Sequence, residues 1–201
     1  MTLPCLCRRS VALSCGSTYA RIFPLWIALK PDCKSTVFFP SDERIVPFDS
    51  GESNWGTIYR NFLSRVEREV DGKHRPKSVQ EFRRMLHDHF KSPEPVFDTI
   101  FLGAGVDGHT ASLFPGNQYL DDADSTVLQT ASPMPPYDRL TLGPAVLIRA
   151  QTVVVVIAGN EKNILVKRFL EKDTALPIVQ ILAKRTGENL VFIEESLAHA
   201  F

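Results

Sequence analysis

No stretch of this sequence is apolar for long enough to cross a membrane. The longest apolar run covers residues 152–158, whereas a membrane-spanning helix needs roughly 20 apolar residues. Neither sign of charge is in excess, because 23 Lys and Arg side chains balance 23 Asp and Glu side chains. This balance argues against a nucleic-acid or membrane partner held by bulk charge, although it leaves room for a local basic pocket.

Cysteine is scarce and confined to the first part of the chain. The spacing of these cysteines fits no paired zinc motif, and no histidine lies near them. A disulfide framework is implausible for a chain of this size whose remaining residues include no cysteine. We therefore expect reduced structural thiols, rather than metal or redox sites, at Cys5, Cys7, Cys15 and Cys33.

The length of 201 residues predicts one domain, residues 1–201, that is large enough to bury a core. Residues 1–10 contain two arginines and no acid, but they lack the apolar segment of a secretory signal. We interpret residues 1–10 as a ragged start without a targeting signal and expect a cytoplasmic location. No internal repeat or linker divides the rest of the chain.

Short apolar runs alternate with segments of helical spacing. Runs typical of buried strands cover residues 11–13, 36–39, 99–102, 126–130, 139–142, 152–158 and 189–193. Helical spacing covers residues 19–29, 55–66, 79–90, 144–150, 161–170 and 177–182. Pro24 predicts a late start or a kink in the first helix. The order predicts an α/β, Rossmann-like fold: a mostly parallel, doubly wound sheet with helices on both faces.

Four polar loops each follow a predicted strand, and in a parallel sheet such loops converge on one edge. The loops comprise residues 14–18, 41–47, 103–109 and 159–162. Glycine-rich loops at helix N-termini present N–H groups to anions, and arginine and lysine add positive charge. This mixture suits a phosphorylated ligand. The residues alone also allow a simpler interpretation, with solvated surface charges and glycines that only form turns.

His109 is the best candidate for a catalytic base among the five histidines. It follows a glycine-rich stretch, and an imidazole titrates near neutral pH. Asp107, two residues earlier, is placed to fix the tautomer of the ring or to bind substrate hydroxyls. A lone histidine is nevertheless more often structural, so the residue pattern leaves both roles open.

The sequence Gly-Ala-Gly-Val-Asp-Gly-His-Thr-Ala-Ser-Leu-Phe-Pro at residues 103–115 resembles the signature of the 6-phosphogluconolactonase family. Residues 41–47, followed by Glu-Ser-Asn at residues 52–54, resemble the second motif of that family. Residues 13–18 resemble its first loop, and residues 139–142 and 158–162 match later segments in the right order. The resemblance extends from about residue 11 to the C-terminus.

The resemblance implies hydrolysis of 6-phosphoglucono-δ-lactone to 6-phosphogluconate in the oxidative pentose phosphate pathway, by an enzyme without a metal or organic cofactor, which we expect to be a monomer. His109 would deprotonate the attacking water, while Asp107 and Asp42 would orient the histidine or the substrate hydroxyls. The resemblance assigns the remaining candidates to binding of the substrate and its phosphate: Gly16, Ser17, Thr18, Arg44, Gly103, Gly105, Arg139 and Lys162.

Two departures from the family pattern leave alternatives open. Cys15 replaces a usual glycine, and its Cβ is expected to obstruct the phosphate or strain a loop that favours positive φ. The N-terminal segment typical of the family is largely absent, which would uncover an apolar flank of the sheet. One alternative is a sugar-phosphate-binding module with impaired catalysis. The other is glucosamine-6-phosphate deaminase/isomerase, which resembles this chain less because residues 112–115 lack its catalytic glutamate.

Overall fold

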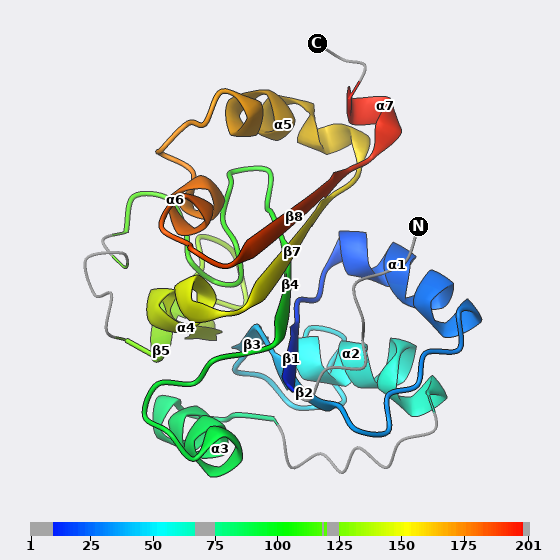
Figure 1. The fold of residues 1–201 in the computed structure, drawn as a ribbon, viewed down its shortest axis with the longest axis vertical. Helices are drawn as coiled ribbons and strands as arrows, with labels where there is room; N and C mark the ends of the chain where they lie inside the picture. Colours follow the sequence, from blue (N-terminus) through cyan, green and yellow to red (C-terminus); the bar gives the residue numbers. More distant parts are fainter. Residues whose placement is uncertain (1–9, 67–74, 118, 120–124, 199–201) are drawn as a thin grey trace.

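Five parallel strands form the centre of the computed structural model, which describes residues 10–66, 75–117, 119 and 125–198 (Figure 1). The strand order is β2-β1-β4-β7-β8, and every neighbouring pair is parallel. The chain thus forms the predicted doubly wound sheet, with a topological switch point between β1 and β4. The strands are β1 Ser10–Leu13, β2 Val37–Pro40, β4 Thr99–Gly103, β7 Thr152–Ile157 and β8 Glu188–Ile193.

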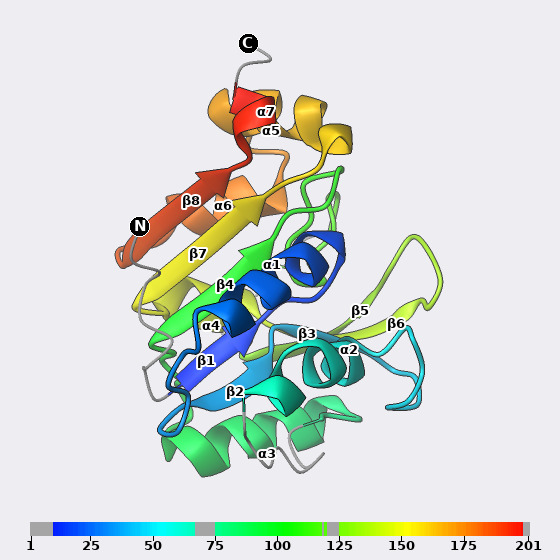
Figure 2. The same cartoon turned by 90° about the vertical axis from the view of Figure 1, so that its right-hand side faces the viewer.

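A smaller antiparallel sheet lies beside the parallel one, in the order β3-β6-β5 (Figure 2). The strands β5, Val127–Ala131, and β6, Asp138–Leu142, were both predicted, and the proline-rich residues 132–137 connect them without regular structure. Strand β3, Asp42–Arg44, was missed because it is short and entirely charged. The prediction of a mostly parallel sheet is therefore correct but incomplete.

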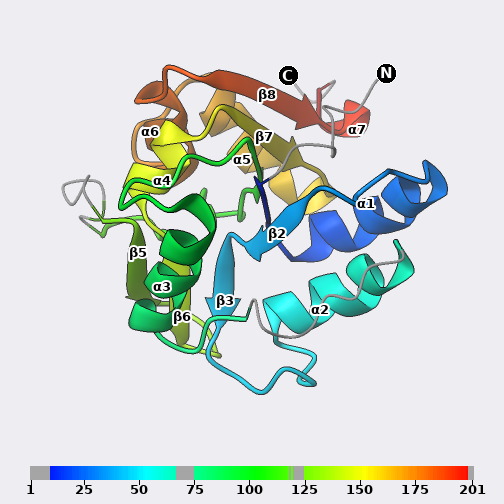
Figure 3. The same ribbon diagram turned by 60° about the horizontal axis from the view of Figure 1, so that its bottom comes forward.

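Helices cover both faces of the parallel sheet, as predicted (Figure 3). Side chains of α1 and α2 pack with Val11 and Leu13 on one face, while α3, α4, α5 and α6 pack with Ala12 on the other. This alternation along β1 follows from the period-two geometry of a strand. The helices are α1 Ser17–Ala28, α2 Asn54–Asn61, α3 Val79–Phe90, α4 Pro144–Arg149, α5 Asn163–Leu170, α6 Pro177–Ala183 and α7 Glu195–Ala198.

Several helix boundaries differ from the predictions. Helix α1 begins at Ser17, earlier than predicted, and continues through Pro24. The predicted helix over residues 55–66 divides at Phe62, where φ is −135°, into α2 and the short 3₁₀ helix η1, Leu63–Arg65. The segment before α5 is likewise a 3₁₀ helix, η4, Asn160–Lys162. Helix α3 matches its prediction, because Ser78 accepts a hydrogen bond from the Glu81 amide and Lys91 ends the helix with φ of 53°.

Three findings bear on the composition-based predictions. Cys15 and Cys33 are both thiols, whereas Cys5 and Cys7 lie outside the described residues, as does nearly all of the expected ragged start. None of the helices within the described ranges is long and apolar enough to span a membrane. The same residues contain no group of three or more His, Cys, Asp or Glu side chains arranged to hold a metal ion.

Candidate active site

A cavity of about 640 Å³ opens at the carboxyl ends of β1 and β4, at the switch point of the sheet. Its volume is in the usual range for small-molecule sites. All the residues that the sequence singled out line its wall, from all four predicted loops and from β6. They are Gly16, Ser17, Thr18, Asp42, Arg44, Gly103, Gly105, Asp107, His109, Arg139 and Lys162.

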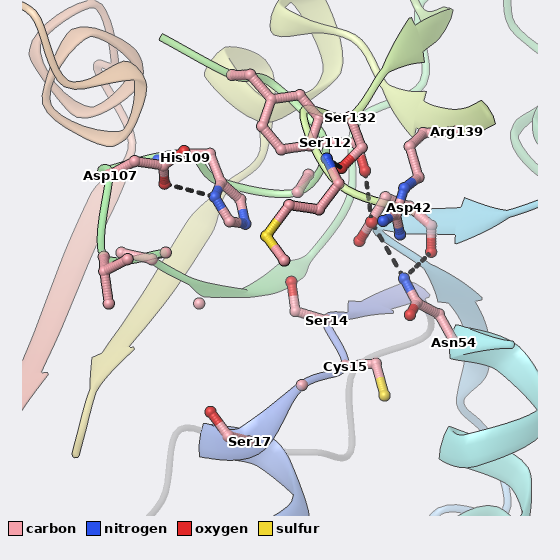
Figure 4. A pocket seen from close by; sticks show the side chains of 18 of the residues that line it. Ser14, Cys15, Ser17, Asp42, Asn54, Asp107, His109, Ser112, Ser132 and Arg139 are labelled. Carbon is pink, nitrogen blue, oxygen red and sulfur yellow. Dashed lines mark hydrogen bonds and ion pairs between the residues drawn. The ribbon is translucent and has the colours of Figure 1, made fainter. Parts of the chain in front are cut away.

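His109 and Asp107 form a close pair on this wall (Figure 4). The Nδ1 atom of His109 lies 2.6 Å from Oδ1 of Asp107, and the same oxygen accepts the His109 backbone N–H at 3.1 Å. Partial burial raises the pKa of Asp107, but the hydrogen bonds and charge of His109 outweigh this effect, so the pKa is lowered overall. An ionised Asp107 accepts a hydrogen bond from Nδ1–H, which leaves Nε2 of a neutral His109 as the basic nitrogen.

The backbone of the histidine loop is held rigidly around this pair. Gly105 has no room for a side chain, because a Cβ atom would lie 2.1 Å from the imidazole of His109. Its N–H donates to the His109 carbonyl at 2.9 Å, and Thr110 Oγ1 donates to the Gly103 carbonyl at 2.9 Å. The side of the ring is covered by Phe114, whose centroid lies 5.0 Å from that of His109. The glycine at 105 is thus required for the position of the imidazole.

The first loop brings the N-terminus of α1 to the cavity. Gly16 is the N-cap residue with φ of 126°, a conformation that glycine adopts readily, and no side chain caps the helix there. Cys15 is not among the residues with positive φ, so the expected backbone strain at this position is absent. In Figure 4 the Cys15 side chain points away from His109. Burial raises the pKa of the Cys15 thiol to about 11, although the Gly16 amide opposes the shift.

Asp42 is a buried carboxylate with three side-chain donors. Ser41 Oγ donates to its Oδ1 at 3.0 Å, while Asn54 Nδ2 and Ser112 Oγ donate to its Oδ2 at 3.0 Å and 2.7 Å. No hydrogen bond joins Asp42 to His109 among the described residues, so His109 is oriented by Asp107 instead. Asp42 also lines the cavity.

Two arginines occupy the antiparallel sheet at the cavity. Arg44 of β3 is paired in register with Arg139 of β6, and both line the wall. Arg44 forms an ion pair with the exposed Glu52, whereas the buried Nε atoms of both arginines have no hydrogen-bond partner within the described part of the chain. Burial and the charge of Arg44 both lower the pKa of Arg139. Such a pair of like charges favours an anionic ligand.

Lys162 adds a third cation from the loop after β7. Its side chain is only 7% exposed, and Nζ donates to the Ala104 carbonyl. Burial lowers the pKa of Lys162, while the charges of Glu161 and Asp107 oppose this change. The structure therefore places Lys162 beside the histidine loop, on the wall of the cavity that Arg44 and Arg139 also line.

Sequence reasoning overlooked several residues of the wall. Ser112 and Asn54 lie inside the quoted motifs, but their hydrogen bonds to Asp42 depend on tertiary contacts between residues 70 and 12 positions apart. The proline-rich segment that connects β5 and β6 was predicted only to be an ordered loop, although four of its residues line the cavity. A hairpin loop after a predicted strand was the available signal. The other overlooked residues are Ser14, Tyr19, Ala104, Val106, Ala111, Phe114, Ser132, Pro133, Met134 and Pro135.

A family model for glucosamine-6-phosphate isomerases/6-phosphogluconolactonase matches residues 7–192. The chain belongs to this family. Among its curated relatives, the rat and human 6-phosphogluconolactonases are each 37% identical over 167 residues, which represent 78% of this chain and 65% of each relative. A putative 6-phosphogluconolactonase of Caenorhabditis elegans is 32% identical over 91% of this chain and 73% of its own. The chain thus spans slightly less than two thirds of the length of the mammalian family members.

Solved structures of the glucosamine-6-phosphate isomerase/6-phosphogluconolactonase family agree with the fold. The 6-phosphogluconolactonase of Trypanosoma brucei superimposes with a TM-score of 0.73 at 29% identity, over 94% of this chain and 84% of that chain. The devB protein superimposes with a TM-score of 0.82 at 26% identity, over 95% and 86%. A monomeric glucosamine-6-phosphate deaminase, at 18% identity and a TM-score of 0.76 over 96% and 88%, shows a shared fold alone.

Proposed function

We propose that this protein hydrolyses 6-phosphoglucono-δ-lactone to 6-phosphogluconate. The observation that carries the proposal is the His109–Asp107 pair, which lines the same cavity as Arg44, Arg139 and Lys162. A general base and a cluster of cations in one small-molecule cavity suit a neutral ester-like bond in an anionic substrate. The family and the names of the 37% identical relatives support the same reaction.

In the proposed mechanism, Nε2 of His109 takes a proton from a water molecule that attacks the lactone carbonyl. Asp107 holds Nδ1 and stabilises the imidazolium that forms. The tetrahedral intermediate then collapses by breaking the bond to the ring oxygen, and His109 returns the proton to that oxygen. General base catalysis of this kind contributes about 10²- to 10⁴-fold in rate.

The cations are proposed to bind the phosphate and to stabilise the oxyanion. Arg44 and Arg139 supply a positively charged wall, and the uncapped N-terminus of α1 supplies backbone N–H groups. In the histidine loop, the amides of Gly105 and Gly108 already donate to the carbonyls of His109 and Gly105. Because these two amides are occupied, the oxyanion depends more on a cationic side chain such as Lys162.

The proposal is tested by following acid release from freshly prepared 6-phosphogluconolactone, relative to spontaneous hydrolysis. Wild type should accelerate the reaction, and His109→Ala should remove most of the acceleration. His87→Ala is the matched control, because His87 lies on the exposed surface of α3, away from the cavity. The proposal fails if wild type gives no acceleration, or if His109→Ala retains it.

The same preparations separate the alternative functions. Binding of 6-phosphogluconate without acceleration would indicate a module with impaired catalysis. Release of ammonia from glucosamine 6-phosphate would indicate a deaminase. The structure offers no support for the latter, because Phe114 packs against His109 in the segment where a deaminase is expected to carry its glutamate.

A further inference from the structure

A chain of hydroxyl groups runs from the cavity wall to the buried carboxylate of Asp42. Ser14 Oγ lies 2.8 Å from Ser41 Oγ, and Ser41 Oγ lies 3.0 Å from Asp42 Oδ1. Ser41 is fully buried and does not line the cavity, whereas Ser14 and Asp42 both do. In Figure 4 the Ser14 hydroxyl points into the cavity, between His109 and the Asp42 side.

The direction of these hydrogen bonds follows from counting protons. A carboxylate only accepts, so the single hydroxyl proton of Ser41 is committed to Asp42. The contact between the two serines then requires the proton of Ser14, which must donate to Ser41. The Ser14 oxygen is left with lone pairs and no proton to offer the cavity. Ser14 is therefore an acceptor toward any ligand.

Asp42, like Ser14, can act only as an acceptor toward a ligand. Its Oδ2 already accepts from Ser112 and Asn54, and these two donors come from different segments of the chain. Its Oδ1 accepts only from Ser41 among the described residues, and a carboxylate oxygen has room for a second donor. The carboxylate thus keeps a fixed orientation while one acceptor site remains.

We propose that Ser14 Oγ and Asp42 Oδ1 together bind hydroxyl groups of the substrate, and that Ser41 is the positioning residue that keeps both as acceptors. This inference rests on the proposed function, because it takes the ligand to be a polyhydroxylated sugar-acid phosphate. A sugar hydroxyl can donate to this wall, whereas a phosphate dianion has no proton to donate. The arrangement therefore selects hydroxylated ligands and directs the phosphate toward the cations.

The test measures dissociation constants by calorimetry for 6-phosphogluconate and for its analogues that lack a single hydroxyl at C2, C3 or C4. For wild type, loss of one of these hydroxyls should weaken binding by about five- to tenfold, the usual effect of one neutral hydrogen bond. Ser14→Ala should weaken binding of 6-phosphogluconate by a similar factor. It should cause no further loss with the analogue that lacks the recognised hydroxyl.

Two further variants separate positioning from general damage. Ser41→Ala should also reduce discrimination between 6-phosphogluconate and that analogue, because the Ser14 proton is no longer committed to Ser41. Ser10→Ala is the matched control. Ser10 is a buried serine at the start of β1, the strand that leads to Ser14, and its Oγ donates to Asp98 Oδ2 at 2.6 Å, away from the cavity. It should preserve the discrimination.

Equal losses for all ligands with Ser14→Ala, or no discrimination by wild type, would overturn the inference. Because the readout is binding, it does not depend on lactone hydrolysis. A wild type that binds and discriminates but does not hydrolyse would leave the inference standing while refuting the proposed function. A wild type that does not bind 6-phosphogluconate would refute the inference, whereas the lactone assay alone decides the proposed function.

Discussion

Arg44 and Arg139 face each other across neighbouring antiparallel strands, although they carry the same charge. A cross-strand pair of like charges is unfavourable, and burial of Arg139 adds to the cost. The arrangement becomes favourable when an anion lies between or beside the guanidinium groups. We interpret this unfavourable pairing as preorganisation of the two guanidinium groups for binding a phosphate.

Replacing Arg139 by Gln should therefore affect the phosphorylated substrate selectively. Hydrogen bonds to charged groups contribute about 1.5–3 kcal/mol, so KM for 6-phosphogluconolactone should rise roughly 10- to 100-fold. Hydrolysis of unphosphorylated glucono-δ-lactone should change little. Steady-state kinetics with both lactones measure the difference, with Arg149→Gln, in a surface ion pair with Glu94, as the control. A loss of equal size on both lactones would contradict phosphate binding by Arg139.

Asp107→Asn should lower kcat by about 100-fold with a much smaller change in KM. The neutral amide can present either its NH₂ donor or its carbonyl acceptor to Nδ1, so it neither fixes the tautomer nor stabilises the imidazolium as the carboxylate does. Kinetics at saturating lactone test this expectation. A raised KM with unchanged kcat would instead place Asp107 in substrate binding.

The same substitution has a pH-dependent effect on stability. The pKa of Asp107 is lowered in the folded protein, so its charged form is favoured by folding. The stabilising contribution is fully present above the ordinary aspartate range, about pH 4, and is lost as the pH falls through the lowered pKa. Chemical denaturation measures the free energy of unfolding of wild type and Asp107→Asn. The difference between these two free energies should be constant near neutral pH and should shrink below about pH 4.

Cys15→Gly and Gly16→Ala should behave differently despite being neighbours. Glycine at 15 should preserve or raise activity, because Cys15 has no positive φ to maintain and its Cβ is removed from the cavity wall. Alanine at 16 meets no atom within 4 Å, but the φ of 126° strains any residue with a Cβ. Gly16→Ala should therefore lower the free energy of unfolding by about 1–3 kcal/mol and displace the start of α1. Thermal unfolding and lactone assays of both variants test this contrast, which a large loss in Cys15→Gly would refute.

Arg185 should prove essential to stability rather than activity. Its buried guanidinium donates to backbone carbonyls in two segments, including Leu147 at 2.6 Å, Ala150 at 2.9 Å and Glu188 at 3.1 Å. Arg185→Met would leave these carbonyls without donors, at a cost of about 3 kcal/mol. At about 2–4 °C per kcal/mol, Tm should fall by roughly 6–12 °C.

Differential scanning calorimetry measures the Tm of Arg185→Met, with Arg168→Met as the comparison. Arg168 pairs with Asp173 at the surface, where both side chains are about one-third exposed. Solvent screens such a pair, so Tm should change by only a few degrees at most. Equal effects of the two substitutions would show that the carbonyl contacts of Arg185 contribute little.

The parallel sheet was predictable because its central strands are buried on both faces and so consist of apolar runs, as in residues 152–157. Strand β3 could not be recognised in this way. Asp42 and Arg44 line the cavity, while Glu43 is turned to the opposite side, where it accepts the amides of Asn54 and Trp55 at the start of α2. Each of these polar side chains has a separate tertiary partner, and such partners produce no periodic pattern in the sequence from which a strand could be predicted.

The candidate site was predictable to the level of its loops but not of its contacts. Strand ends in a parallel sheet meet at one edge, so the loops containing His109 and Arg44 were expected to converge. Asp42 hydrogen-bonds to Ser41, Asn54 and Ser112 and not to His109, which leaves the orientation of substrate hydroxyls as the prediction for this residue. Only the three-dimensional contacts distinguish these options.

The position of β1 between β2 and β4 also limits when a functional molecule can arise during synthesis. The first loop of the cavity follows residue 13, whereas the strand that completes its other side begins at Thr99 and pairs with Val11. Lys162 emerges later still. A nascent chain can therefore form α1 and α2 early, while one edge of β1 stays unpaired until β4 has been synthesised. The complete binding site forms only after most of the chain has left the ribosome.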